Sequence, residues 1–202
     1  MPTLADLKGF NWTHAAIRAD LDVLETKAHA VETATPKDRK RYLNYVLYHA
    51  AMLKMHHDGE EQYFFPKLRT PDTADAFDRL HAEHEAVLPL LQKLETIAKS
   101  DKTEASFPSD VIAYAKAVRD HLADEERMAA AYVESQENFD RWIELEHGYQ
   151  QHIPKAELML ALPWLVERLS ESDRPVFLSR LPAMVRMAYP AMIAPAFRAR
   201  LP

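Results

Sequence analysis

The chain has 202 residues, of which 48% are hydrophobic, and a formal net charge of -6. These values fit one globular domain with or without a small appendage, and the negative charge argues against nucleic-acid binding, which needs a basic surface. The absence of cysteine excludes disulfides, thiolate catalysis, iron–sulfur clusters and cysteine-based zinc sites. With no basic start before an apolar run and no apolar stretch of about 18 residues, we expect a cytoplasmic protein without signal peptide or transmembrane helix.

Four long helices are predicted in the first two thirds of the chain. Apolar residues recur at helical spacing, and glycine is scarce. Thr35 can cap a helix, and Pro36 suits a first helical turn. The predicted helices cover residues 4–33 (or 11–33), 36–65, 70–100 and 109–137. Helices of this length joined by short loops predict an all-α fold, an up-down-up-down four-helix bundle over residues 1–137.

Residues 138–202 have a different composition. Seven prolines interrupt this segment, and from Ile153 onward it carries seven Lys or Arg against four Asp or Glu. We expect a C-terminal extension of short amphipathic helices. Packing of this extension on the bundle is the favoured interpretation, and a homodimer interface or peripheral membrane contact are the alternatives.

Each predicted long helix places histidine on its apolar face, and two of them also place glutamate there. The residues are His14, His56 with Glu60, His84, and His121 with Glu125. One buried histidine is usually an ordinary core residue, but burying such groups in four helices is costly unless they are paired or bind metal. A histidine and a glutamate four residues apart lie one turn apart on one face and can bind one ion or join two.

The ligand types narrow the choice of metal. Imidazole and carboxylate without sulfur favour iron or manganese over structural zinc, and two carboxylates that can bridge suit a two-metal site. Ferritin-like bundles need two Glu-x-x-His motifs, whereas only Glu144 to His147 fits here, outside the four long helices. Zinc-protease, phosphate-loop and dinucleotide motifs are absent.

The motifs resemble those of the hemerythrin-like family. The run from Met55 to Leu68, MHHDGEEQYFFPKL, resembles the family signature of a histidine, three residues, two acidic residues and an aromatic pair before proline. The run from His121 to Glu126 resembles a second copy, and Leu80–His84 and Trp12–Arg18 resemble the remaining helices. The resemblance spans about residues 10–135, and the tail around Trp164 is similar to the extension of some bacterial members.

The resemblance implies two iron ions, bridged by an oxo or hydroxo group and by two carboxylates. The implied ligands are His14, His56, Glu60, His84, His121 and Glu125, with His81 as a candidate seventh. Oxygen-carrying hemerythrins offer two histidines four residues apart on the third helix, whereas His81 and His84 are three apart. Without His81, one iron would have fewer nitrogen ligands and a more open site, unlike a reversible oxygen carrier.

Other polar residues leave alternatives open. His57 with Glu61 is a pair shifted by one residue, but it would point about 100° away, and Pro66 has the family spacing from His56. His49 lies two turns before His56 on the same face. It could support the metal site or have an ordinary, partly buried role. Tyr45, Tyr63, Tyr114 and Tyr132 could lie near the core, where ordinary packing is favoured. His29, His147 and His152 are predicted at the surface.

Three functions use the same ligands: binding or sensing of O2 or NO, turnover of peroxide or NO by an enzyme, and iron buffering. An open coordination position permits either binding or chemistry. An enzyme of this kind could also assist iron–sulfur repair, but relatives with that role often carry a cysteine-containing N-terminal segment, which is missing here. We expect a di-iron protein that binds O2, NO or peroxide in oxidative or nitrosative stress.

Overall fold

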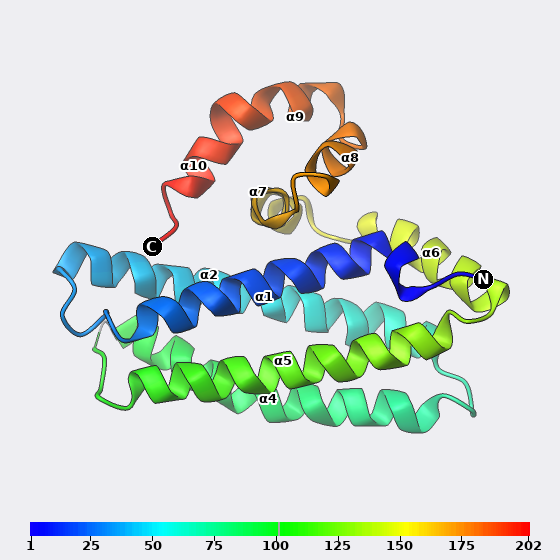
Figure 1. Cartoon of the computed structure of the whole chain (residues 1–202), viewed down its shortest axis with the longest axis horizontal. Helices are drawn as coiled ribbons and strands as arrows, with labels where there is room; N and C mark the ends of the chain where they lie inside the picture. Colours follow the sequence, from blue (N-terminus) through cyan, green and yellow to red (C-terminus); the bar gives the residue numbers. More distant parts are fainter. Residues whose placement is uncertain (101) are drawn as a thin grey trace.

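Four long helices form the body of the molecule. The computed structural model describes residues 1–100 and 102–202. The long helices are α1 (Lys8–Ala28), α2 (Pro36–Gly59), α4 (Ala74–Ser100) and α5 (Phe107–Tyr132), and a short 3-10 helix, η1 (Leu4–Asp6), precedes them. They lie side by side, and successive long helices run in opposite directions (Figure 1). Helices α1 and α4 each pack against both α2 and α5. The prediction of an all-α fold is confirmed, and the described residues contain no strand.

The helix boundaries follow local capping chemistry. The hydroxyl of Thr35 accepts a hydrogen bond from the backbone N–H of Asp38 at 3.2 Å, which confirms the predicted start of α2. Helix α5 begins at Phe107, two residues before the predicted start, because Pro108 fits a first turn in which its missing N–H is not needed. Of the loop predicted before α5, residue 101 lies outside the described residues.

Helix α2 continues without a break through a proline. A π-helical turn, η2 (Glu60–Phe64), follows α2 and leads into α3 (Phe65–Leu68), so the helix passes the end predicted near Pro66. Proline lacks an N–H and clashes with the carbonyl of the preceding turn in a regular α-helix. The wider π turn accommodates that missing donor, and such turns change which side chains share a helix face.

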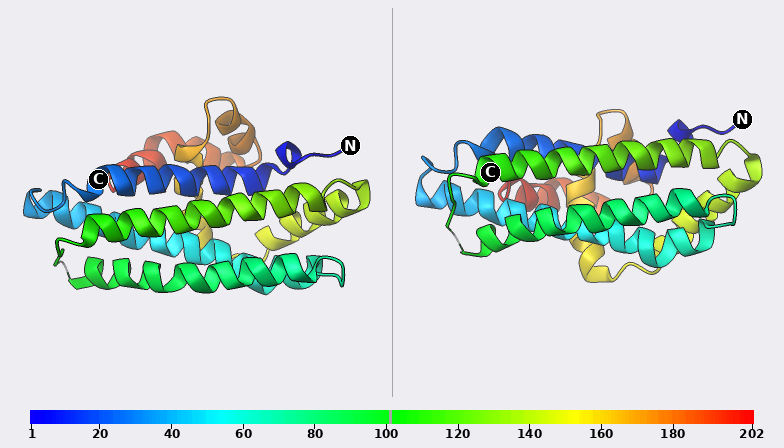
Figure 2. Two further views of the ribbon diagram at one scale, coloured as in Figure 1. Left: turned by 60° about the horizontal axis from the view of Figure 1, so that its bottom comes forward. Right: turned by 90° about the horizontal axis from the view of Figure 1, so that it is seen from below.

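The remaining helices form the tail. They are α6 (Gln136–Gln150), α7 (Lys155–Arg168), α8 (Asp173–Ser179), α9 (Ala183–Ala188), η3 (Tyr189–Ile193) and α10 (Ala194–Arg198). Helices α7 to α10 lie on the side of the bundle formed by α1 and α2 (Figure 2). Trp164 and Phe197 enter the core of the bundle, while Val166 and Tyr189 belong to a smaller cluster within the tail. The division into two units at residue 137 stays a prediction. None of the described helices combines the length and apolar character needed to cross a membrane.

Two apolar clusters fill the bundle, one on each side of a polar layer. The main cluster includes Ile17, Leu53, Val87 and Leu122, and the end cluster includes Phe10, Phe65, Leu80 and Ala129. On every long helix, the histidine or glutamate predicted as a ligand lies in sequence between the members of these clusters or next to them. The two clusters therefore enclose the polar layer along the bundle axis.

Candidate metal centre

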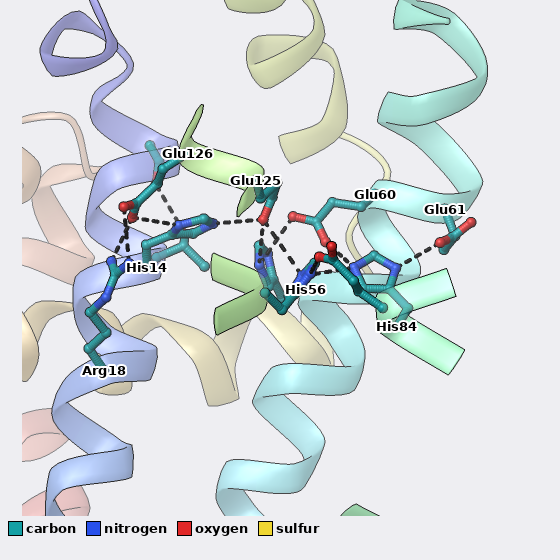
Figure 3. Close-up of polar contacts among 12 residues, drawn as sticks. His14, Arg18, His56, Glu60, Glu61, His84, Glu125 and Glu126 are labelled. Carbon is teal, nitrogen blue, oxygen red and sulfur yellow. Dashed lines mark hydrogen bonds and ion pairs between the residues drawn. The ribbon is translucent and has the colours of Figure 1, made fainter. Parts of the chain in front are cut away.

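All four long helices contribute side chains to the polar layer. These side chains are His14 from α1, His56 and His57 from α2, Glu60 from η2, His84 from α4, and His121 and Glu125 from α5. Figure 3 shows His14, Glu60, Glu125 and His84 pointing toward one another between the helices. His14, His121 and Glu125 are at most 1% exposed.

The ligand atoms fall into two groups that share a carboxylate. The first group consists of His14, His56, Glu60 and Glu125, and the second of His57, Glu60, His84 and His121. Within each group, one ligand atom of every residue lies within 4.8 Å of those of the others. Two four-residue groups joined by Glu60 have the donor types and the spacing of a site for two neighbouring cations.

Several buried atoms in this layer have no hydrogen-bond partner among the described residues. They are Nε2 of His14, His56 and His57, and Oε2 of Glu60 and Glu125. His14 Nε2 lies 3.1 Å from Glu125 Oε2 without making a hydrogen bond with it. Leaving buried polar atoms unsatisfied costs about 1–3 kcal/mol for each group. Bound cations would satisfy all of these atoms, so the donor set fits a metal centre.

Carboxylates hold three of the imidazoles from behind. The Nδ1 to oxygen distances are 2.9 Å for His14 and Glu126, 2.7 Å for His84 and Glu61, and 3.0 Å for His121 and Glu83. Each of these carboxylates can accept a hydrogen bond from the Nδ1–H of its imidazole, which leaves Nε2 on the side of the ring that faces the layer. Carboxylates placed behind histidines in this way are the usual support of metal-binding imidazoles.

A further side chain, that of Arg18, holds the carboxylate that lies behind His14. Arg18 donates two hydrogen bonds to Glu126, of 2.6 and 3.0 Å (Figure 3). Burial alone would raise the pKa of Glu126, but His14 and Arg18 lower it to about 2. The carboxylate behind His14 is therefore ionised at neutral pH and fixes the orientation of the ring.

Two ring nitrogens face each other in the second group. His84 Nε2 lies 3.0 Å from His121 Nε2, while Glu61 and Glu83 lie against the Nδ1 atoms of the two rings. Two lone pairs at this distance repel unless a proton or a metal ion interacts with both. Burial lowers the pKa of His121 to about 4, so the ring is neutral at pH 7, the state in which imidazole binds metals.

The two buried glutamates have opposite pKa shifts. Burial and the nearby charge of Glu125 raise the pKa of Glu60 well above its ordinary value. Burial also opposes ionisation of Glu125, but His14 and the neighbouring imidazoles hold its pKa well below the ordinary value. Two adjacent buried carboxylates cannot both ionise cheaply without compensating positive charge.

The sequence-predicted residues are not all in the layer. Six of the seven lie in the two groups, whereas the side chain of His81 is 59% exposed and its Nδ1 lies 3.0 Å from Glu61 Oε1. His57 occupies the second group instead, with its ring stacked on His84 at a centroid distance of 4.0 Å. The available signal for His57 in the sequence was its position directly after His56, in the motif that ends at Pro66. The assignment of ligands stays a prediction.

The remaining candidate histidines and tyrosines lie outside the layer. His49, Tyr45 and Tyr114 belong to a separate buried hydrogen-bond network. Tyr132 packs in the end cluster, and Tyr63 is half-buried. His29, His147 and His152 are exposed, as predicted.

The fold and this layer define a class, the helical bundles whose core holds metal-binding imidazoles and carboxylates. Residues 11–133 match the family model of the hemerythrin HHE cation binding domain. The match covers more than half of the chain, and the chain belongs to this family, as the sequence motifs predicted. No curated protein and no solved structure shows a significant match to the chain.

Proposed function

We propose that this chain is a non-haem di-iron protein that binds O2, NO or peroxide. The observation that carries the proposal is the position of Glu60, which belongs to both groups of ligand atoms. A second carboxylate supports it, because Glu125 Oε2 lies 3.9 Å from both His56 Nε2 and His121 Nε2, one atom from each group. Two carboxylates between two sets of imidazoles suit a pair of ions better than a single ion.

The proposed ligands follow from the two groups. His14, His56, Glu60 and Glu125 would hold one iron, and His57, Glu60, His84 and His121 the other. In this proposed ligand set, His57 replaces His81. When bound, the iron pair supplies open coordination positions and one-electron redox chemistry.

The protein itself supplies orientation and exclusion of water. Outer carboxylates fix three imidazoles, and Phe10 and Phe65 pack against the rings of His14 and His84 at centroid distances of 4.0 and 5.7 Å. The polar layer is enclosed between two apolar clusters, which favours ligands of a few atoms over larger substrates. Binding of such small ligands is the basis of the role in oxidative or nitrosative stress that we propose.

The first test is metal analysis and visible spectroscopy of the full-length chain purified in air. We expect about two irons per chain and a ferric absorption spectrum that changes on addition of azide, peroxide or NO. Rapid consumption of peroxide or NO would indicate an enzyme. A spectrum that none of the added ligands changes would indicate iron buffering. Zinc, or a single iron, would contradict the di-iron proposal.

Matched variants connect the spectrum to the residues. His56→Ala and His121→Ala each remove a buried imidazole from a different group and should each lose at least one iron. His29→Ala removes an exposed imidazole at the end of α1 and should keep both irons. Full iron content in the first two variants would refute the assignment.

A further inference from the structure

A second buried polar cluster lies inside the bundle. One layer of the main apolar cluster separates it from the candidate ligands. The hydroxyl of Tyr114 on α5 lies 2.7 Å from Nε2 of His49 on α2. Nδ1 of the same ring lies 3.4 Å from Oδ2 of Asp20 on α1. All three side chains are at most 1% exposed. A phenol, an imidazole and a carboxylate thus form a chain across three helices.

The partners fix the direction of each hydrogen bond. Asp20 also accepts from the indole nitrogen of Trp164 at 2.7 Å and from Nε of Arg168 at 3.0 Å. Burial alone would raise the pKa of Asp20, but His49, Arg168 and Tyr45 outweigh it and hold the pKa below its ordinary value. Because the ionised carboxylate only accepts, Nδ1 of His49 carries a proton, and in this tautomer of the neutral ring Nε2 is the acceptor that faces the hydroxyl of Tyr114.

Two other buried phenols, Tyr42 and Tyr45, have partners of a different kind. Tyr42 donates to the backbone carbonyl of Leu24 at 2.8 Å, and an amide oxygen does not take up a proton near neutral pH. Tyr45 donates to Asp20, but the neighbouring guanidinium of Arg168 disfavours removal of an electron from this ring. Among the tyrosines that the structure describes, Tyr114 is the one whose hydroxyl faces an imidazole nitrogen.

The cluster lies at a fixed distance from the candidate metal centre. His49 is seven residues before His56, and Tyr114 is seven residues before His121, so each lies about 10 Å along its helix from a candidate ligand. Apolar side chains such as Leu53 and Val118 fill the intervening layer. No hydrogen bond between described residues connects the two polar sites, so this layer can pass an electron but offers no route for a proton.

We propose that Tyr114 is a redox-active tyrosine that the oxidised metal centre converts to a neutral radical. The O–H bond of Tyr114 breaks, the proton forms an N–H bond with Nε2 of His49, and one electron passes to the metal centre. The oxidant is the iron pair after reaction with a peroxide, and this part rests on the proposed function. The carboxylate of Asp20 compensates the charge of the resulting imidazolium.

The environment explains why electron and proton must leave together. Burial raises the pKa of Tyr114 well above its ordinary value, so the phenol does not ionise before it is oxidised. A buried radical cation would be costly in an apolar core. An adjacent base removes that cost, since the proton moves only the length of one hydrogen bond.

The tyrosine can be tested without iron. Because the chain has no cysteine, Lys116→Cys introduces a single thiol at an exposed site two residues from Tyr114, to which a ruthenium photo-oxidant can be attached. The full-length chain is prepared with Zn²⁺, which has no redox chemistry. After a flash with an external electron acceptor, we expect the absorption and electron paramagnetic resonance signals of a tyrosyl radical.

Three substitutions in this labelled chain decide the assignment. Tyr114→Phe should abolish the signal, and Tyr42→Phe, at another buried phenol, should keep it. His49→Gln keeps a hydrogen-bond acceptor but not a base, and should slow radical formation roughly a hundredfold. A signal that survives Tyr114→Phe would overturn the site, and an unchanged rate in His49→Gln would overturn the role of His49.

A second arm identifies the oxidant. Hydrogen peroxide is added to the unlabelled, iron-loaded chain, and samples are frozen for electron paramagnetic resonance after their iron content is measured. A tyrosyl radical that Tyr114→Phe abolishes supports the full proposal. If two irons are present and only the flash experiment gives a radical, the metal centre is not the oxidant. If iron is missing, the di-iron proposal fails, and the flash experiment still decides the tyrosine.

Discussion

The carboxylate of Asp20 on α1 accepts a 2.7 Å hydrogen bond from the indole nitrogen of Trp164 on α7. Both side chains are buried, and Arg168, one turn further along α7, donates to the same carboxylate. The tail is therefore attached to the bundle through a buried charge in addition to apolar contacts. Removing a donor leaves that charge less compensated, which costs more than the loss of the contact alone.

Substitution of the two donors should destabilise the fold by different amounts. Trp164→Phe removes a hydrogen bond to a charged group and should cost about 1–3 kcal/mol. Arg168→Met removes the cation and should cost about 3–5 kcal/mol, because it leaves a buried carboxylate without its ion pair. Urea unfolding at constant metal content measures both values. Lys116→Ala, which breaks an exposed ion pair with Asp120, is the control and should have little effect.

Asp20 also predicts a pH dependence. Its pKa in the folded chain is lower than its ordinary value, so it stabilises the fold above that value, and this stabilisation is lost as the pH falls through the folded pKa. The charged or titratable groups that face it are His49, Arg168 and Tyr45. Wild-type stability should therefore fall more steeply than that of Asp20→Asn below about pH 4. Equal slopes in acid unfolding would contradict this prediction.

Glu83 should strengthen metal binding although it is not a candidate ligand. Its carboxylate lies 3.0 Å from Nδ1 of His121 and orients that ring. Glu83→Ala should weaken iron binding roughly 10–100-fold, as measured by competition with a chelator. Glu85→Ala, two residues along the same helix at an exposed position, is the matched control. Similar losses in both variants would indicate a general effect of negative charge rather than orientation of His121.

His57 and His81 should differ in their effect on metal content. Nε2 of His57 is buried in the second group, whereas the side chain of His81 is 59% exposed. His57→Ala should therefore lose iron, and His81→Ala should keep its iron content and visible spectrum. Metal analysis of the two variants beside wild type is sufficient. Iron loss confined to His81→Ala would restore the assignment made from the sequence.

The sequence predicted the parts of the site that follow regular helical spacing. His14, His84 and His121 lie one turn from apolar residues on the same face, so periodicity places them in the core. The place of His57 does not follow from the periodicity of one face, because His57 is adjacent to His56 on α2 and lies about 100° around the helix from it. The contact of Arg168 with Asp20 joins residues 148 positions apart, and no local pattern specifies it.

Gly59 illustrates how the tail reaches the metal layer. This residue ends α2, immediately before Glu60, with an ordinary helical φ of −62°. A Cβ atom here would collide with the hydroxyl of Tyr149 on α6, which donates to the carbonyl of Met55 at 3.3 Å. The glycine is therefore needed for the close approach of α6 and not for its backbone conformation.

Because Gly59 is needed for space and not for its backbone conformation, the effect of Gly59→Ala on stability should change sign in a double-mutant cycle with Tyr149→Ala. Gly59→Ala should destabilise the wild type by about 1–3 kcal/mol, because the tyrosine must move. In a Tyr149→Ala background the collision is absent, and the same substitution should stabilise the chain by about 0.5–1 kcal/mol, since alanine is the better helix former. Unfolding free energies of the four proteins test the cycle. If Gly59→Ala costs the same in both backgrounds, Tyr149 is not what requires the glycine.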